Sequence, residues 1–164
     1  MKHLEIRLLE GLIALFMLAV CFVGLRAAWA LFAGPYIVNG VRVWRLIDTV
    51  CASSACLGIV PVLIASGALL SVCERVARNE PFCEENVRAL RRIAVCGAAV
   101  LAVCALAFLL YIVYGAQDQM MARVMAWASV GIALGASAVA LCARVLSALV
   151  GRARALLLEN ELTI

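Results

Sequence analysis

The chain has 164 residues, of which 67% are apolar and only 15% are charged, and its formal net charge is +4. A soluble domain averages about 45–50% apolar residues and cannot hide so much apolar surface. The composition therefore excludes a soluble globule, a disordered chain and a small secreted scaffold, and it indicates an integral membrane protein.

Four long apolar blocks divide the chain. Three of them carry no charged residue, and the first carries only Arg26. Each is close to the ~20 residues of helix that span the hydrocarbon core of a bilayer. Backbone polar groups in lipid must be paired, which favours helices. The sequence therefore predicts an all-α integral membrane protein, a single four-helix bundle over residues 1–164. The predicted helices cover residues 11–33, 50–73, 93–114 and 124–143.

The first block also carries a weak processing signal. Ala28 and Ala30 have the small-x-small spacing of a leader cleavage site, and Cys21 lies in a stretch similar to a lipoprotein box. Glu5 and Glu10 are unusual in such a leader, and the apolar run is long enough to span. We therefore expect the first helix to be retained.

The basic residues predict the orientation. Ten of the 14 Lys and Arg residues lie on one side of the predicted bundle, together with both termini. Because cytoplasmic segments are enriched in Lys and Arg, both termini are expected in the cytoplasm. The ten are Lys2, Arg7, Arg75, Arg78, Arg88, Arg91, Arg92, Arg144, Arg152 and Arg154.

Aromatic residues mark the opposite side. Every Trp and Tyr falls at an outer helix end or in the first outer loop, which predicts a belt at the membrane interface. An aromatic binding cage is the alternative hypothesis. The residues are Trp29, Tyr36, Trp44, Tyr111, Tyr114 and Trp127.

The first outer loop predicts a small hairpin. Two β-favouring stretches, residues 36–38 and 41–44, flank Asn39-Gly40. An Asn-Gly pair in this setting is the strongest short signal for a two-residue hairpin turn.

The inner loop forms an elbow at residues 74–92. Glu74 and Arg78 are spaced for an ion pair along a continuing second helix. Asn79 and Pro81 should end that helix. A new helix is expected near Cys83, with two acidic residues in its first turn, where the helix dipole favours negative charge.

The elbow and the C-terminal tail allow two interpretations. The elbow is either a solvated connection with arginines extending into the headgroup layer, or a docking surface anchored by Phe82. The tail, residues 144–164, has an apolar stripe at helical spacing and is expected to form an amphipathic helix lying flat in the inner interface. Residues proposed for partner binding are Pro81, Phe82, Asn86, Arg88, Arg91, Leu162 and Ile164.

Two stretches carry a resemblance to a known family. They are NEPFCEENVRALRRI at residues 79–93 and ENELTI at residues 159–164. Both are similar to the bacterial membrane family catalogued as domain of unknown function 2975, which shows a Pro-Phe, a helix cap, Glu-Asn and Leu-Arg, and an acidic Leu-Thr-Ile ending. Cys83 departs from the Ser or Thr usual there, and a thiol caps a helix less well than a hydroxyl.

This resemblance implies a four-helix protein of the bacterial inner membrane. Family members are often encoded beside a small helix-turn-helix regulator of the Cro/repressor type. The resemblance thus implies a membrane partner for a cytosolic DNA-binding protein, without direct nucleic-acid binding by this chain. It supplies no catalytic residue.

Motifs for chemistry are sparse, so we expect no enzyme, no cofactor and no metal site. The single His3 is near the N-terminus, and no Cys-x-x-Cys occurs among the eight cysteines. Small apolar filler is the usual role of such cysteines. Four of them lie near the inner face, but their irregular spacing disfavours a thiolate metal site. They are Cys73, Cys83, Cys96 and Cys142.

Two further features concern the membrane itself. Arg26 is the one intramembrane charge, and we expect it to extend to the outer interface, pair with Asp48 or hold an anionic ligand. Gly131 and Gly135 form a G-x-x-x-G pair, and Ser54 and Gly58 repeat the small spacing. Such residues predict close helix packing within the bundle, with homodimerisation as the alternative.

Three functions remain open at this stage. The first is a regulatory or interaction protein that engages a cytosolic partner through the elbow and tail. The second is a small-molecule transporter or exporter subunit, disfavoured by the lack of intramembrane acids and repeated halves. The third is a thiol-based membrane redox enzyme, which lacks the usual cysteine pair.

Overall fold

The computed structural model describes residues 2–32, 36–38, 41–43, 46–78, 83–114 and 119–162. Side chains are described over residues 7–29, 49–78, 83–113, 120 and 123–156. Four long helices and one β-hairpin make up these residues. They are α1 (Lys2–Phe32), β1 (Tyr36–Val38), β2 (Val41–Val43), α2 (Leu46–Ala77), α3 (Glu84–Tyr114) and α4 (Gln119–Leu162).

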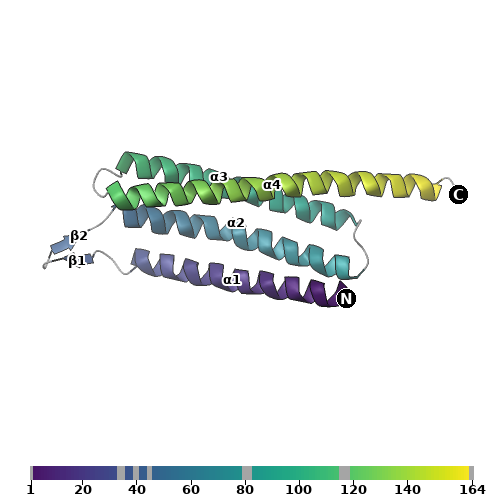
Figure 1. The fold of residues 1–164 in the computed structure, drawn as a ribbon, viewed down its shortest axis with the longest axis horizontal. Helices are drawn as coiled ribbons and strands as arrows, with labels where there is room; N and C mark the ends of the chain where they lie inside the picture. Colours follow the sequence, from purple (N-terminus) through teal and green to yellow (C-terminus); the bar gives the residue numbers. More distant parts are fainter. Residues whose placement is uncertain are drawn as a thin grey trace.

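The helices run up and down in chain order (Figure 1). Among the described residues, extensive helix packing joins α1 to α2, α2 to α3 and α3 to α4. Helices α1 and α4 lie on opposite sides of the bundle (Figure 1). Both termini lie at the end where α2 leads to α3, called the elbow end here. The other end, beside the hairpin, is called the hairpin end.

All four helices are long and apolar enough to cross a membrane. The candidate spans contain most of each predicted block, and large apolar side chains such as Leu12 and Leu25 are 67% and 71% exposed. Such surfaces need lipid around them, because contiguous apolar patches of this size are rare on soluble monomers. The chain is a multi-pass membrane protein with a four-helix bundle, as predicted.

The predicted hairpin is confirmed. β1 and β2 pair antiparallel with Tyr36 opposite Val43 and Val38 opposite Val41. The predicted turn residues, Asn39 and Gly40, lie outside the described residues. The register nevertheless leaves just these two positions between the strands, as expected for a two-residue turn.

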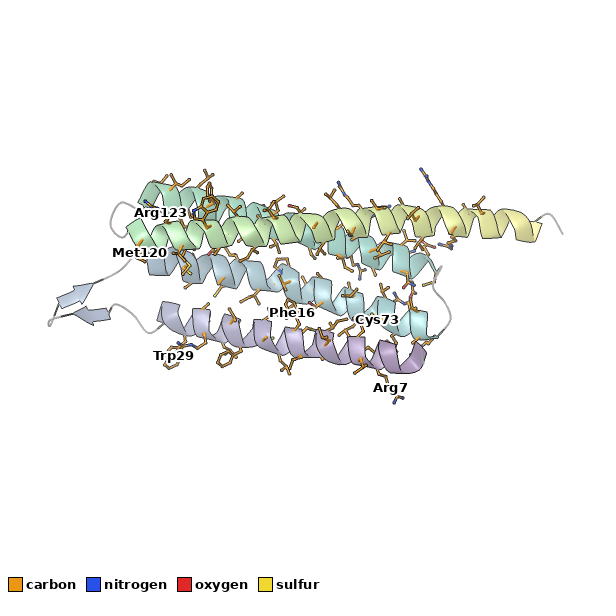
Figure 2. All side chains as sticks on the ribbon, viewed as in Figure 1. Arg7, Phe16, Trp29, Cys73, Met120 and Arg123 are labelled. Carbon is orange, nitrogen blue, oxygen red and sulfur yellow. The ribbon has the colours of Figure 1, made fainter. Side chains whose placement is uncertain are left out.

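The aromatic prediction holds only in part. Trp29 and Trp127 are 69% and 71% exposed, and Trp29 lies toward the hairpin end with Met120 and Arg123 (Figure 2). Tyr111 does not join them, because it is 5% exposed and packs with Cys51 and Met125. Its ring is therefore part of the core. The side chains of the other three aromatic residues lie outside the described residues.

The C-terminal tail is helical, as expected, but it does not lie flat. It continues α4 without a break and runs antiparallel to α3 (Figure 1). No proline interrupts this stretch. Gly151 lowers helix stability by about 1 kcal/mol relative to alanine, but it lies in the groove facing α3 and does not end the helix. Contacts with α3 hold the tail in line, as described below.

The close approach of α3 to α4 is not at the predicted glycines. A Cβ added at Gly97 of α3 would lie 2.8 Å from Cβ of Ala140 and 3.1 Å from the carbonyl oxygen of Ala136, both on α4. By contrast, an added Cβ at Gly131, Gly135 or Gly58 would meet nothing within 4 Å.

The prediction that Gly131 and Gly135 pack inside the bundle is therefore wrong. The spacing shows that one face of the helix carries small residues. It does not show whether another helix packs against that face, which depends on the tertiary structure. Both glycines are exposed, so homodimerisation through them stays a prediction. Ser54 donates a hydrogen bond to the carbonyl oxygen of Cys51 within its own helix, at 2.9 Å.

A Gly97→Ala variant tests this packing. It should lower the free energy of unfolding by about 1–3 kcal/mol, because the added methyl overpacks the α3–α4 contact. Gly131→Ala is the matched control and should leave stability unchanged or raise it by up to about 1 kcal/mol. Unfolding in mixed detergent micelles measures both, and equal stabilities would contradict the assigned contact.

Candidate functional site at the elbow end

The first turn of α3 joins three helices by ion pairs. Glu85 Oε2 lies 2.9 Å from Nη2 of Arg75 at the end of α2. Glu84 pairs with Arg88 one turn along α3, and its Oε2 lies 3.2 Å from Nη1 of Arg154 on α4. The adjacent glutamates point to different neighbours, so this single turn fixes both contacts.

A buried amide supports the same junction. Asn86 is 2% exposed, and its Oδ1 lies 3.4 Å from Nη1 of Arg75, which donates the hydrogen bond. Arg75 therefore spans two consecutive residues of α3. The sequence predicts Asn86 on a partner surface, but its side chain is buried and unavailable there. It belongs instead to the junction between α2 and α3.

Below this junction, α3 packs on the tail part of α4. Leu90, Ile93, Ala94 and Ala143 form a buried cluster. Ser147 Oγ donates a hydrogen bond to the carbonyl oxygen of Val87 at 3.3 Å. These contacts explain why the tail follows α3.

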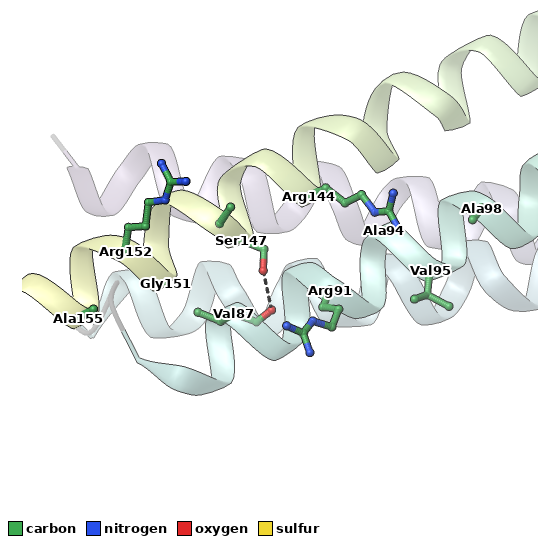
Figure 3. A pocket seen from close by; sticks show the side chains of 11 residues that line it. Val87, Arg91, Ala94, Val95, Ala98, Arg144, Ser147, Gly151, Arg152 and Ala155 are labelled. Carbon is green, nitrogen blue, oxygen red and sulfur yellow. Dashed lines mark hydrogen bonds between the residues drawn. The ribbon is translucent and has the colours of Figure 1, made fainter.

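Beside this contact lies a groove of about 760 Å³ between α3 and α4. Its floor and walls are mostly small apolar residues, and its charged residues are Arg91 on α3 and Arg144 and Arg152 on α4. In Figure 3 these arginines surround the hydrogen bond between Ser147 and Val87. We call this the arginine groove. The sequence predicts these arginines on the same side of the membrane. It does not predict that they line one groove, because that depends on how α4 packs on α3.

A second cavity lies toward the hairpin end. It is an apolar cleft of about 530 Å³ lined by all four helices, with Tyr111, Ser54 and Ser129 among the few polar side chains. The cleft has α1 on one side and α4 on the other, with α2 and α3 between them. In a bilayer, its exposed apolar wall faces lipid.

The structure places the remaining predicted residues as follows. Arg88 is exposed and paired with Glu84, and Arg91 lines the arginine groove. Pro81, Phe82 and Ile164 lie outside the described residues, and Leu162 is described only as the last residue of α4. The predicted pair of Glu74 and Arg78 is confirmed.

At the other end, Arg26 is exposed, and the side chain of its expected partner, Asp48, lies outside the described residues. All eight cysteines are free thiols. Within the described part of the chain, no three His, Cys, Asp or Glu side chains come close enough to hold a metal ion.

Comparison with known proteins gives one finding. Residues 27–164 match the model of the family described as protein of unknown function DUF2975. The chain belongs to this family. The match begins within α1 and includes the hairpin, the elbow and the whole of α4. No curated protein and no solved structure matches the chain. In this DUF2975 protein, the junction built on α3 therefore lies inside the matched region.

An Asn86→Ala variant tests the junction of the DUF2975 bundle. It should lower the free energy of unfolding by about 1–3 kcal/mol, because a partly buried Arg75 loses a hydrogen-bond partner. Arg78→Ala breaks an exposed pair and should cost only about 0.5 kcal/mol. Thermal unfolding in detergent compares the two, and an equal loss would argue against the role of Asn86.

Proposed function

We propose that this DUF2975 protein is a membrane-embedded interaction protein. It binds a cytosolic partner, a small helix-turn-helix regulator, through the elbow and the end of α4. The observation that carries the proposal is that α4 is longer than the bundle requires and extends past the elbow end (Figure 1).

The ion pairs define where this extension begins. Arg154 pairs with Glu84, the first residue of α3, and α4 runs antiparallel to α3. The part of α4 after Arg154 therefore extends beyond α3, over about 12 Å at helical rise. Leu156, at its base, is 64% exposed. A helix with an exposed apolar anchor fits the groove of a partner protein.

Charge supports a basic partner. The extension contains Glu159 and Glu161 and no Lys or Arg after Arg154. DNA-binding proteins are basic on the surface that contacts phosphate. An acidic helix that covers such a surface would compete with DNA and hold the regulator at the membrane.

Binding through this end requires the elbow end to face the cytoplasm of a bacterial inner membrane. The basic residues near it support that orientation. A fluorescent protein that folds only in the cytoplasm, fused after Ile164, should fluoresce. Alkaline phosphatase, active only outside the inner membrane, should be active when inserted between β1 and β2. The opposite pattern would contradict the proposed orientation.

Co-purification tests the partner. The full chain is co-expressed with a small helix-turn-helix regulator of the Cro/repressor type and extracted in mild detergent. Truncation after Ala155 should abolish recovery of the regulator. Leu156→Ala should weaken binding about tenfold, the effect of removing one interface anchor.

Leu149→Ala is the matched control. Leu149 is 55% exposed, and it lies two turns earlier on nearly the same face of α4, alongside α3. It should leave recovery unchanged. Equal recovery of the regulator with the truncated and full chains would overturn the proposal.

A further inference from the structure

The arginine groove points to a ligand that the proposed function does not require. We propose that it binds the phosphate headgroup of an anionic phospholipid. The phosphate would lie between Arg91 and Arg144, with Arg152 adding positive charge toward the elbow end and the acyl chains along the apolar wall of α3. This inference is independent of the partner at the end of α4.

The arginines of the groove are not neutralised by the described carboxylates of the elbow. Three glutamates of the elbow are already paired, Glu74 with Arg78, Glu85 with Arg75, and Glu84 with both Arg88 and Arg154. Among the side chains that the structure describes, none of these carboxylates pairs with an arginine of the groove. The groove therefore holds three positive charges that an anion can neutralise. Guanidinium groups suit phosphate because they donate hydrogen bonds in a planar fork.

The three arginines lie at different levels along the two helices. Ser147 contacts Val87, so antiparallel packing places Arg144 at about the level of Arg91, one turn closer to the hairpin end. Arg152 lies about 12 Å from Arg144 along α4, toward the elbow end. The arginines are thus spread along the groove, on both of its helices.

The groove also has an apolar wall on α3. Ala94, Val95 and Ala98 line the same groove just beyond Arg91, inside the predicted span 93–114. Val95 is 64% exposed, so it faces the surroundings of the bundle. The groove is therefore basic where the headgroup layer begins and apolar where the hydrocarbon begins. Basic pockets of this kind between transmembrane helices bind anionic headgroups.

A soluble phosphate compound shares the headgroup chemistry, but it has no acyl chains to contact the apolar wall. A phospholipid uses both parts of the groove. This assignment also explains Arg91 better than the partner surface predicted from the sequence, because Arg91 lines the groove between α3 and α4.

The experiment uses the full chain, delipidated in a neutral detergent. Dioleoyl phosphatidylglycerol and dioleoyl phosphatidylcholine, which share their acyl chains, are added in mixed micelles. Lipid binding is followed by native mass spectrometry and by the thermal shift of tryptophan fluorescence. Phosphatidylglycerol should bind and stabilise the chain, and phosphatidylcholine should not. Inorganic phosphate and glycerol 3-phosphate at millimolar concentration should produce no comparable shift.

The variant replaces all three groove arginines by glutamine. Its affinity for phosphatidylglycerol should fall on the order of a hundredfold, at roughly fivefold per arginine. Replacing the same residues by lysine keeps the charge and should retain most of the affinity. The charge-matched control is Arg7→Gln with Arg78→Gln and Arg123→Gln, which lie outside the groove, and it should bind as the unaltered chain does.

Several results would overturn the proposal. One is equal binding of the two lipids, and another is an equal loss of affinity in the control. A loss in the lysine variant as large as in the glutamine variant would show that packing, and not charge, is responsible. Stabilisation by inorganic phosphate equal to that by phosphatidylglycerol would assign the groove to a soluble anion.

Discussion

The need to pair every backbone amide inside lipid shapes this molecule. A chain with so much apolar sequence can satisfy that need only with continuous helices, and each of the four helices runs without a break through its candidate span. Lipid removes most of the hydrophobic drive for helices to associate. Close contacts such as that of Gly97 with Ala140 then become important for packing, and the ion pairs at the elbow end add to them.

At the elbow end, the ion pairs of a few carboxylates lie between two different surfaces, the arginine groove and the end of α4. The glutamates at the start of α3 pair with arginines of α2, α3 and α4, and this leaves the groove arginines free of the paired acids. Beyond the last of these pairs, α4 continues with acidic residues and an exposed leucine. One helix therefore carries a basic groove alongside α3 and an acidic extension beyond the start of α3. The two proposals place a lipid in the first and a protein on the second.

Much of the fold follows from local sequence. The apolar blocks, the Asn-Gly hairpin and the pair of Glu74 with Arg78 all depend on residues close together in the chain, and the structure has each of them. The candidate site followed less well. The sequence favours a partner surface for Asn86, but its side chain is buried and accepts a hydrogen bond from Arg75 of α2. Tyr111 looks like an interface residue, but Met125 of α4 packs on it.

The sequence by itself determined that the chain crosses a membrane, how many helices it forms and where they turn, because hydrophobicity and turn chemistry act over short distances. Only the tertiary structure decided which face of each helix is covered. The exposed Gly131 and the covered Gly97 have the same lack of a side chain, and they differ only in what the neighbouring helix places opposite them. The arginine groove arises in the same way, since the antiparallel packing of α4 on α3 brings together charges from distant parts of the chain.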